Sequence, residues 1–70
     1  MAGISRAAIE RIMRKANAER VSANALEEMA ELMEEYGLKI SWEAASLARH
    51  AGRKTVKKKD VKLAARRMDR

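Results

Sequence analysis

The sequence predicts an all-α protein, and three observations support this prediction. Residue types that favour helices dominate the chain, proline is absent, and glycine occurs only three times. Apolar residues recur at steps of three and four over most of the 70 positions. Segments rich in turn-forming residues interrupt this pattern near residues 17–22 and 51–57.

The first predicted helix is short. Small and apolar residues recur there every four positions: Ile4, Ala8, Ile12 and Ala16. This spacing places them on one face of about three helical turns. The pattern ends in NAERVS, residues 17–22, where Ser22 is a residue type that often caps the start of a helix.

The next apolar pattern runs from Leu26 almost to Gly52, and Gly37 allows two interpretations of it. As the residue after a helix end, Gly37 would divide the chain into a four-helix bundle, with Ser41 capping a new helix. Inside a helix it would cost only about 1 kcal/mol relative to alanine. The apolar stripe keeps its phase across the glycine, which favours one continuous helix.

A last helix is predicted after AGRKTV by the apolar residues Val61, Leu63, Ala64, Ala65 and Met68. A continuous central helix of about 28 residues would be roughly 42 Å long, whereas a compact chain of this length is only about 28 Å across. Two short helices cannot cover an apolar stripe of that length. The pattern therefore predicts an obligate dimer in which the long helices cross.

Length and composition limit the function. Seventy residues form one small domain, residues 1–70. With no cysteine and one histidine, disulfides and His/Cys zinc sites are excluded. Since no triad or dyad spacing occurs, we expect neither catalytic residues nor a cofactor. We expect a cytoplasmic protein, because no apolar run has the length of a signal peptide or transmembrane helix.

The net charge of +6 is unevenly distributed along the chain. Residues 1–22 carry five basic against two acidic side chains, residues 23–48 carry one against six, and residues 49–70 carry ten against two. Basic ends around an acidic middle indicate a polyanionic partner. The two aromatic residues lie in the acidic middle, so the basic segments offer no stacking surface for single-stranded nucleic acid.

Three stretches give the chain a resemblance to archaeal histones: AERVS at 18–22, the helix from Ala25 to Ala51, and LARHAGRKTVKKKDVKLAARRM at 47–68. The resemblance implies the histone fold, which is a short helix, a loop, a long central helix, a loop and a short helix. Two chains then form a head-to-tail handshake dimer. The resemblance also implies a domain without tails and a chromosome-associated location.

The function that the resemblance implies is compaction of double-stranded DNA, largely without sequence specificity. Dimers would wrap DNA and assemble into tetramers or longer nucleosome-like particles. Loop 17–22 of one subunit would lie beside loop 51–57 of the other. The implied DNA-binding residues are Arg11, Arg14, Arg20, Ser22, Lys54, Thr55 and Lys57, with Arg20 entering the minor groove. Whether Lys58 and Lys59 touch DNA stays open.

The resemblance also suggests how dimers contact each other. The expected dimer–dimer residues are Leu47, His50, Asp60 and Leu63, with His50 of one dimer against Asp60 of the next. Arg53 and Asp60 of one chain are expected to form a structural ion pair. The expected partners are thus DNA and further copies of the chain, with a paralogous histone as another candidate and no membrane.

Two departures from the family pattern leave questions open. Asn17 stands where many members have glycine, which makes close stacking of dimers uncertain, and Trp42 is unusual at its position.

The alternative function is a histone-fold dimerisation module of a larger complex that does not wrap DNA. The basic residues Arg20 and Lys54 argue against this alternative.

Overall fold

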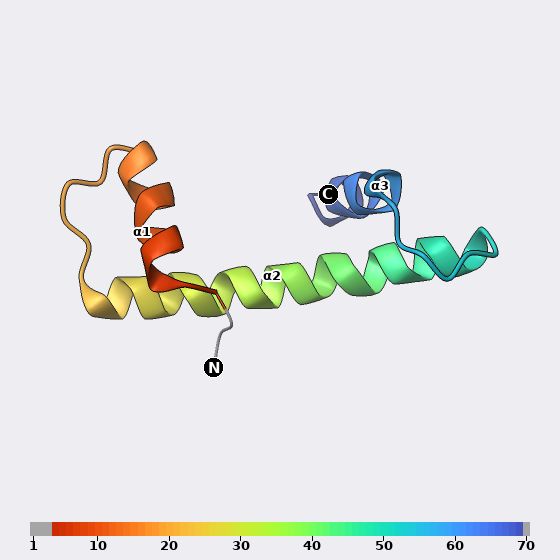
Figure 1. Ribbon diagram of the computed structural model, residues 1–70, viewed down its shortest axis with the longest axis horizontal. Helices are drawn as coiled ribbons and strands as arrows, with labels where there is room; N and C mark the ends of the chain where they lie inside the picture. The colour runs from red at the N-terminus through yellow and green to blue at the C-terminus, as the bar shows by residue number, and fades with distance from the viewer. Residues whose placement is uncertain (1–3, 70) are drawn as a thin grey trace. The chain divides into compact units, whose positions relative to one another are not determined.

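The computed structural model describes residues 4–69, which form three α-helices and contain no strand (Figure 1). Helix α1 spans Arg6–Lys15, α2 spans Ala23–His50 and α3 spans Lys58–Met68. The all-α class and the short–long–short order of the helices are therefore confirmed.

Helix α2 continues without interruption through Gly37. This confirms the prediction of one long helix and excludes the four-helix alternative. A Cβ atom added at Gly37 would meet nothing within 4 Å. Packing within the chain therefore does not require glycine at this position.

Serine hydroxyls set the start of both α1 and α2. The Ser5 Oγ accepts a hydrogen bond from the Ala8 N–H at 3.3 Å, and the Ser22 Oγ accepts one from the Ala25 N–H at 3.1 Å. The Ser5 cap places Ile4 outside α1, although the apolar repeat had included it. The Ser22 cap is the one expected from NAERVS, and α2 begins directly after it at Ala23, two residues before the histone-like stretch that starts at Ala25. The other end of α2 is one residue shorter than expected, since Ala51 follows the last helical residue.

The chain divides into two compact units, which meet in sequence between Glu35 and Tyr36. In the first unit, α1 packs against the first part of α2. Ile9 is completely buried, and Ala30 of α2 is buried as well. Arg6 and Glu27 join the two helices through an exposed ion pair of 2.7 Å.

The second unit contains the rest of α2, the following loop and α3. Its buried apolar residues are all alanines: Ala44, Ala48 and Ala64. Arg67 of α3 forms an ion pair with Glu43 of α2. The Tyr36 hydroxyl donates a hydrogen bond to the Asp69 carboxylate at 3.3 Å. Partial desolvation and, secondarily, the nearby Asp69 charge raise the pKa of Tyr36.

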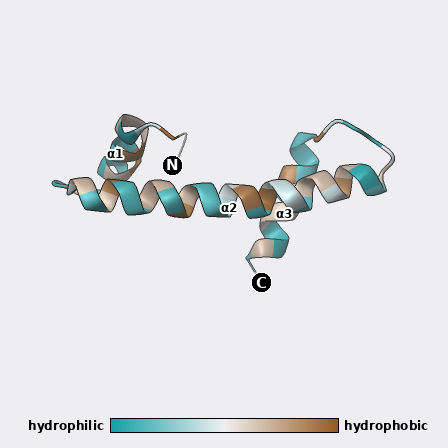
Figure 2. Ribbon diagram, turned by 90° about the horizontal axis from the view of Figure 1, so that it is seen from below, coloured by the Kyte–Doolittle hydropathy of each residue, from teal (hydrophilic) through white to brown (hydrophobic). Residues whose placement is uncertain are grey.

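The buried apolar core of each unit is small. Ile9 is the only large side chain that is completely buried among the described residues. Figure 2 shows hydrophobic and hydrophilic residues alternating along all three helices. Eight large apolar side chains remain exposed: Ile12, Leu32, Tyr36, Leu38, Trp42, Val56, Val61 and Leu63. A single chain therefore leaves much apolar surface in contact with water.

Candidate nucleic-acid interface

The loop after α1 begins with a left-handed turn at Asn17, whose φ is 71°. The Asn17 N–H donates to the Arg14 carbonyl at 2.9 Å, and the Ala18 N–H donates to the Met13 carbonyl at 3.1 Å. These two bonds form a Schellman motif, which satisfies the last carbonyl groups of α1. Asparagine suits the position because it tolerates left-handed backbone better than other non-glycine residues.

Arg20 and Ser22 follow this turn, and both are exposed. Because the Ser22 Oγ caps α2 as a hydrogen-bond acceptor, its O–H remains available to donate to another group. The first N–H groups of α2 lie next to it. A flexible arginine, a hydroxyl and a helix N-terminus together are the kinds of donors that bind phosphate.

Two further arginines lie on α1. Arg11 and Arg14 are both exposed and are three residues apart, so they lie on neighbouring parts of one helix face. Arg14 forms an ion pair of 2.8 Å with Glu10. Since the side chains of Arg14 and Glu10 are 60% and 39% exposed, water screens the pair and its net stabilisation is at most about 1 kcal/mol. Arg14 can therefore exchange Glu10 for a phosphate at little cost.

The loop after α2 begins in the same way as the first. Gly52 has a φ of 75°, its N–H donates to the Arg49 carbonyl at 2.9 Å, and the Arg53 N–H donates to the Ala48 carbonyl at 2.9 Å. This is a second Schellman motif. The glycine meets the left-handed requirement without steric strain.

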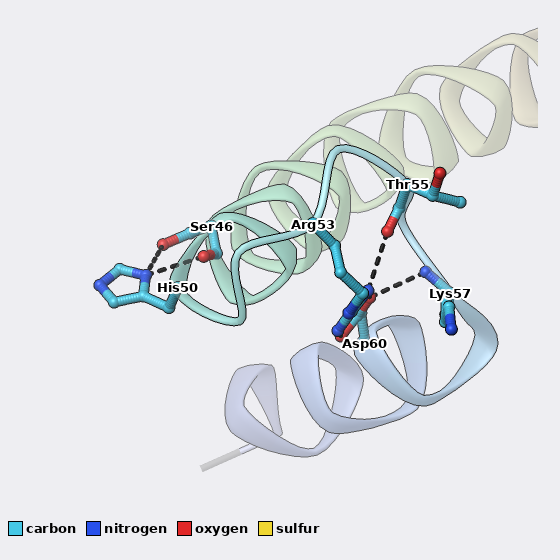
Figure 3. A network of polar contacts seen from close by, with 6 residues as sticks. All are labelled: Ser46, His50, Arg53, Thr55, Lys57 and Asp60. Carbon is cyan, nitrogen blue, oxygen red and sulfur yellow. Dashed lines mark hydrogen bonds and ion pairs between the residues drawn. The ribbon is translucent and has the colours of Figure 1, made fainter.

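Arg53 fixes this second loop to α3 (Figure 3). Its guanidinium donates to both Asp60 carboxylate oxygens, at 2.8 and 2.9 Å, and to the Thr55 carbonyl at 2.8 Å. The structure thus brings together Arg53 and Asp60, the two residues expected to pair. With its donors turned inward, Arg53 supports the loop and does not extend from it.

Asp60 is 5% exposed and also caps α3. Its carboxylate accepts a hydrogen bond from the Lys57 N–H at 2.8 Å, which is the return bond of a capping box. The Lys57 ammonium cannot provide the other bond, since it has no acceptor. The hydrogen bonds from Arg53 and then from Lys57 hold the pKa of Asp60 well below its usual range, and the Asp60 hydrogen bond raises the pKa of Arg53.

The remaining polar residues of the second loop point outward. Lys54, Thr55 and Lys57 are all exposed, and so are Lys58 and Lys59 at the start of α3. The backbone of Lys57 and the carbonyl of Thr55 hold the loop, while the side chains stay free of the bonds that form it. The second loop is therefore a backbone held by hydrogen bonds that presents exposed cations.

His50 lies at the last residue of α2, and its ring points away from the Arg53–Asp60 pair (Figure 3). The Nδ1 atom is 2.8 Å from the Ser46 carbonyl oxygen. Because a carbonyl can only accept, Nδ1 must carry the hydrogen of this bond. Nε2 is then left for an outside partner.

No side-chain hydrogen bond or ion pair among residues 4–69 joins the four residues expected at a dimer–dimer contact to one another. Leu63 and His50 are exposed, Leu47 is half-buried, and Asp60 is buried with its oxygens engaged by Arg53 and Lys57. A carboxylate has about four lone-pair positions, so Asp60 keeps some acceptor capacity for a further donor.

Residues 4–69 provide neither a metal centre nor a membrane span. No group of three or more His, Asp or Glu side chains in this range is placed to hold a metal ion. No helix of the same range is long and apolar enough to cross a membrane.

Three features of the structure were not predicted from the sequence. The left-handed turn at Asn17 could have been suspected from an asparagine directly after an apolar helical repeat. The bond from Arg53 to the Thr55 carbonyl has no sequence signal, because any residue supplies a carbonyl. The pairing of Leu38 with Trp42 on one face of α2 follows from their distance of four residues, but it depends on α2 continuing through Gly37.

A short, a long and a short helix, with cations on both connecting loops, define the class of non-enzymatic histone-fold proteins that act as architectural components of chromatin. Residues 2–65 match the family described as histone-like transcription factor (CBF/NF-Y) and archaeal histone. The chain belongs to this family.

Two archaeal relatives resemble the chain along nearly its whole length. One of the subunits of the archaeal histone HAN1 of Thermococcus zilligii is 52% identical over 66 residues, which are 94% of this chain and 98% of the relative. The probable archaeal histone 3 of Methanocaldococcus jannaschii is 48% identical over 66 residues, with the same coverage. The family resemblance inferred from the sequence motifs is confirmed.

Proposed function

We propose that the chain forms a single histone-fold domain whose head-to-tail dimer binds and wraps double-stranded DNA on the chromosome. The observation that carries this proposal is the construction of the second loop. Arg53 and Asp60 fix its backbone, and Lys54, Thr55 and Lys57 remain free to bind phosphates.

The face of α2 around Gly37 supports the dimer. Within α2, Met33, Gly37, Ile40 and Ala44 follow one another at steps of four, three and four, so they lie on one face. Gly37 has open space around it on this face. A second long helix crossing at Gly37 could approach closely and would explain why a residue with low helix propensity is tolerated there.

In the proposed dimer, the first loop of one subunit lies beside the second loop of its partner. Arg20 and Ser22 would then extend the row of donors formed by Lys54 and Thr55. Arg11 and Arg14 continue the row along α1. Donors of this kind contact the phosphates of the DNA backbone and make few contacts with the base edges. Sequence preference would therefore come from the bendability of the DNA. Arg20 suits an inward-facing minor groove of bent DNA.

Assembly beyond the dimer is proposed to use His50 and Asp60, with Leu47 and Leu63 beside them. His50 offers Nε2, and Asp60 offers its remaining acceptor capacity, so the two groups are complementary when His50 carries both ring protons. The apolar side chains would exclude water around this contact.

Nuclease digestion of DNA reconstituted with the protein, over a series of salt concentrations, tests the proposal. Wrapping predicts protected fragments whose lengths increase in regular steps. It also predicts that the logarithm of the affinity falls linearly with the logarithm of the salt concentration. A single short fragment would retain DNA binding and contradict extended assembly. Absence of protection at low salt would contradict wrapping altogether and favour the alternative of a histone-fold module in a larger complex, for which the exposed Trp42 is the supporting observation.

A further inference from the structure

An apolar patch on α2 is not explained by DNA binding or by the proposed dimer. It consists of Leu38 and Trp42, which are 49% and 68% exposed. The two residues are four apart, so their side chains are neighbours on the helix surface. Tryptophan at this exposure is rare unless another molecule covers it.

The patch lies on the opposite face of α2 from the residues that we assign to the handshake dimer. On an α-helix, each residue turns by about 100°, which places Leu38 and Trp42 across the helix from Ile40 and Ala44. Ala44 is buried, whereas Leu38 and Trp42 are exposed. A handshake dimer would therefore leave the Leu38–Trp42 patch in water.

Further residues extend the patch into a continuous seam. They follow at alternating steps of four and three, which is the spacing of a coiled-coil seam: Glu31, Glu35, Leu38, Trp42, Ala45 and Arg49. We call this set the outer seam. It is acidic at its start, apolar in its middle and basic at its end. Neither Glu31 nor Arg49 has an ion-pair partner within residues 4–69.

The outer seam is complementary to itself. If two copies of α2 pair antiparallel about position 40, Leu38 of each faces Trp42 of the other. Glu31 of each then faces Arg49 of the other, because both lie nine residues from position 40. A parallel pairing in register would instead place Glu31 against Glu31, which is unfavourable. The charged positions therefore select the antiparallel arrangement, and the apolar positions are compatible with it.

We propose that the outer seam is a second self-association surface, through which α2 of one dimer pairs antiparallel with α2 of another. The occupant is a second copy of this chain. Trp42 and Leu38 supply the apolar centre, and the two Glu31–Arg49 pairs fix the register. DNA is an unsuitable occupant because the seam carries glutamates rather than a row of cations.

The experiment uses the full chain without DNA. Trp42 is the only tryptophan, so its fluorescence reports whether the seam is covered. Sedimentation equilibrium measures the mass over the same range of protein concentration. We expect the Trp42 emission to shift to shorter wavelength as mass rises above that of the dimer. Trp42→Ser should weaken this association at least about tenfold while helix content and dimer mass stay unchanged.

Charge reversal tests the register. Glu31→Arg or Arg49→Glu alone should weaken the association about threefold or more, since each places like charges opposite each other twice in the pair. The double variant Glu31→Arg/Arg49→Glu should restore it. The matched control is Glu19→Arg/Arg49→Glu, which has the same net charge but changes an exposed glutamate outside α2. This control should not restore association.

Three results would overturn the proposal. Solvent-exposed Trp42 emission at every concentration would show that nothing covers the seam. Equal masses for the wild type and Trp42→Ser would show that association uses another surface. Failure of the double charge reversal to exceed its control would exclude the antiparallel register. DNA protection, measured separately, can succeed or fail independently of these results.

Discussion

Asp60 joins the second loop to the start of α3 through its hydrogen bonds rather than through charge alone. Its carboxylate binds the Arg53 guanidinium at two points and caps the first turn of α3 through the Lys57 N–H. Removing the charge therefore weakens both the loop and the helix end. A buried carboxylate that is paired and hydrogen-bonded is stable, whereas a half-buried arginine that has lost its charged partner is destabilising.

Asp60→Asn is therefore predicted to lower the stability of the folded protein. At fixed protein concentration, urea unfolding should show a clear loss at neutral pH. Because the folded-state pKa of Asp60 is depressed, its contribution is present above about pH 4 and is lost as pH falls below that value. The difference between the wild type and Asp60→Asn should accordingly shrink on acidification.

Glu10→Gln is the control for this prediction, because Glu10 pairs with Arg14 on an exposed surface. Its effect should stay within about 0.5 kcal/mol. An Asp60→Asn variant no less stable than Glu10→Gln would contradict the supporting role of the buried pair.

The left-handed backbone at Asn17 leads to a second prediction at the residue scale. Alanine is strained at a φ of 71°, whereas glycine is not. Asn17→Ala should lower the free energy of unfolding by about 1 kcal/mol, and Asn17→Gly should change it by only a few tenths of that amount. Urea unfolding of the two variants checks the order, and an Asn17→Ala variant as stable as Asn17→Gly would be inconsistent with the turn.

The hydrogen bond from His50 to the Ser46 carbonyl leaves Nε2 as the ring atom that can meet another dimer. Removing the ring should weaken the proposed dimer–dimer contact, so His50→Ala is expected to lower the mass of the assemblies that sedimentation measures at fixed protein concentration. A His50→Ala variant that assembles like the wild type would contradict the contact.

At the scale of elements, the sequence predicted the helices better than it predicted the hydrogen bonds that set their ends and hold the loops between them. Repeats of apolar residues gave the type, order and continuity of the helices, because burying one face imposes a period of 3.6 residues. Ser22 was recognised in the sequence as a helix cap, whereas the start of α1 depends on the hydroxyl of Ser5, which the apolar repeat does not contain. The Arg53–Asp60 pair was anticipated only from the family resemblance. The third bond of Arg53, to a backbone carbonyl, needed the structure.

Gly37 provides the prediction that belongs to α2. Within one chain, Gly37→Ala meets no atom and should raise helix stability by about 1 kcal/mol. If a second α2 crosses at this point, the added methyl group instead separates the two helices. We expect the dimer to dissociate at higher protein concentration than the wild type, as measured by sedimentation. Exposed Lys39→Ala on the same helix is the control, and an unchanged Gly37→Ala dimer would contradict the crossing at Gly37.

At the scale of the whole molecule, the two signs of charge occupy different parts of the chain. Most basic residues lie on the two loops, on α1 and on α3, whereas most acidic residues lie in α2. The segments proposed to contact DNA therefore carry a net positive charge, which attracts DNA over a long range.

This separation predicts which residues control the salt dependence of DNA binding. Each phosphate contact contributes about 0.9 to the slope of log affinity against log salt. Lys54→Ala and Lys57→Ala should each reduce the slope by roughly 1 per subunit in contact. Lys39→Ala removes the same charge from the acidic middle and should leave the slope unchanged. Equal slopes for all three variants would mean that the second loop does not contact phosphate.

The paired turns at Asn17 and Gly52 have a thermodynamic consequence. Both loops leave their helices through completed Schellman motifs, and Arg53 fixes the second loop before any ligand arrives. A partner that meets such loops has little backbone to order, so binding avoids most of the entropy loss of coupled folding. Calorimetry of DNA binding should then give only a small change in heat capacity, with released counterions as the main source of favourable entropy.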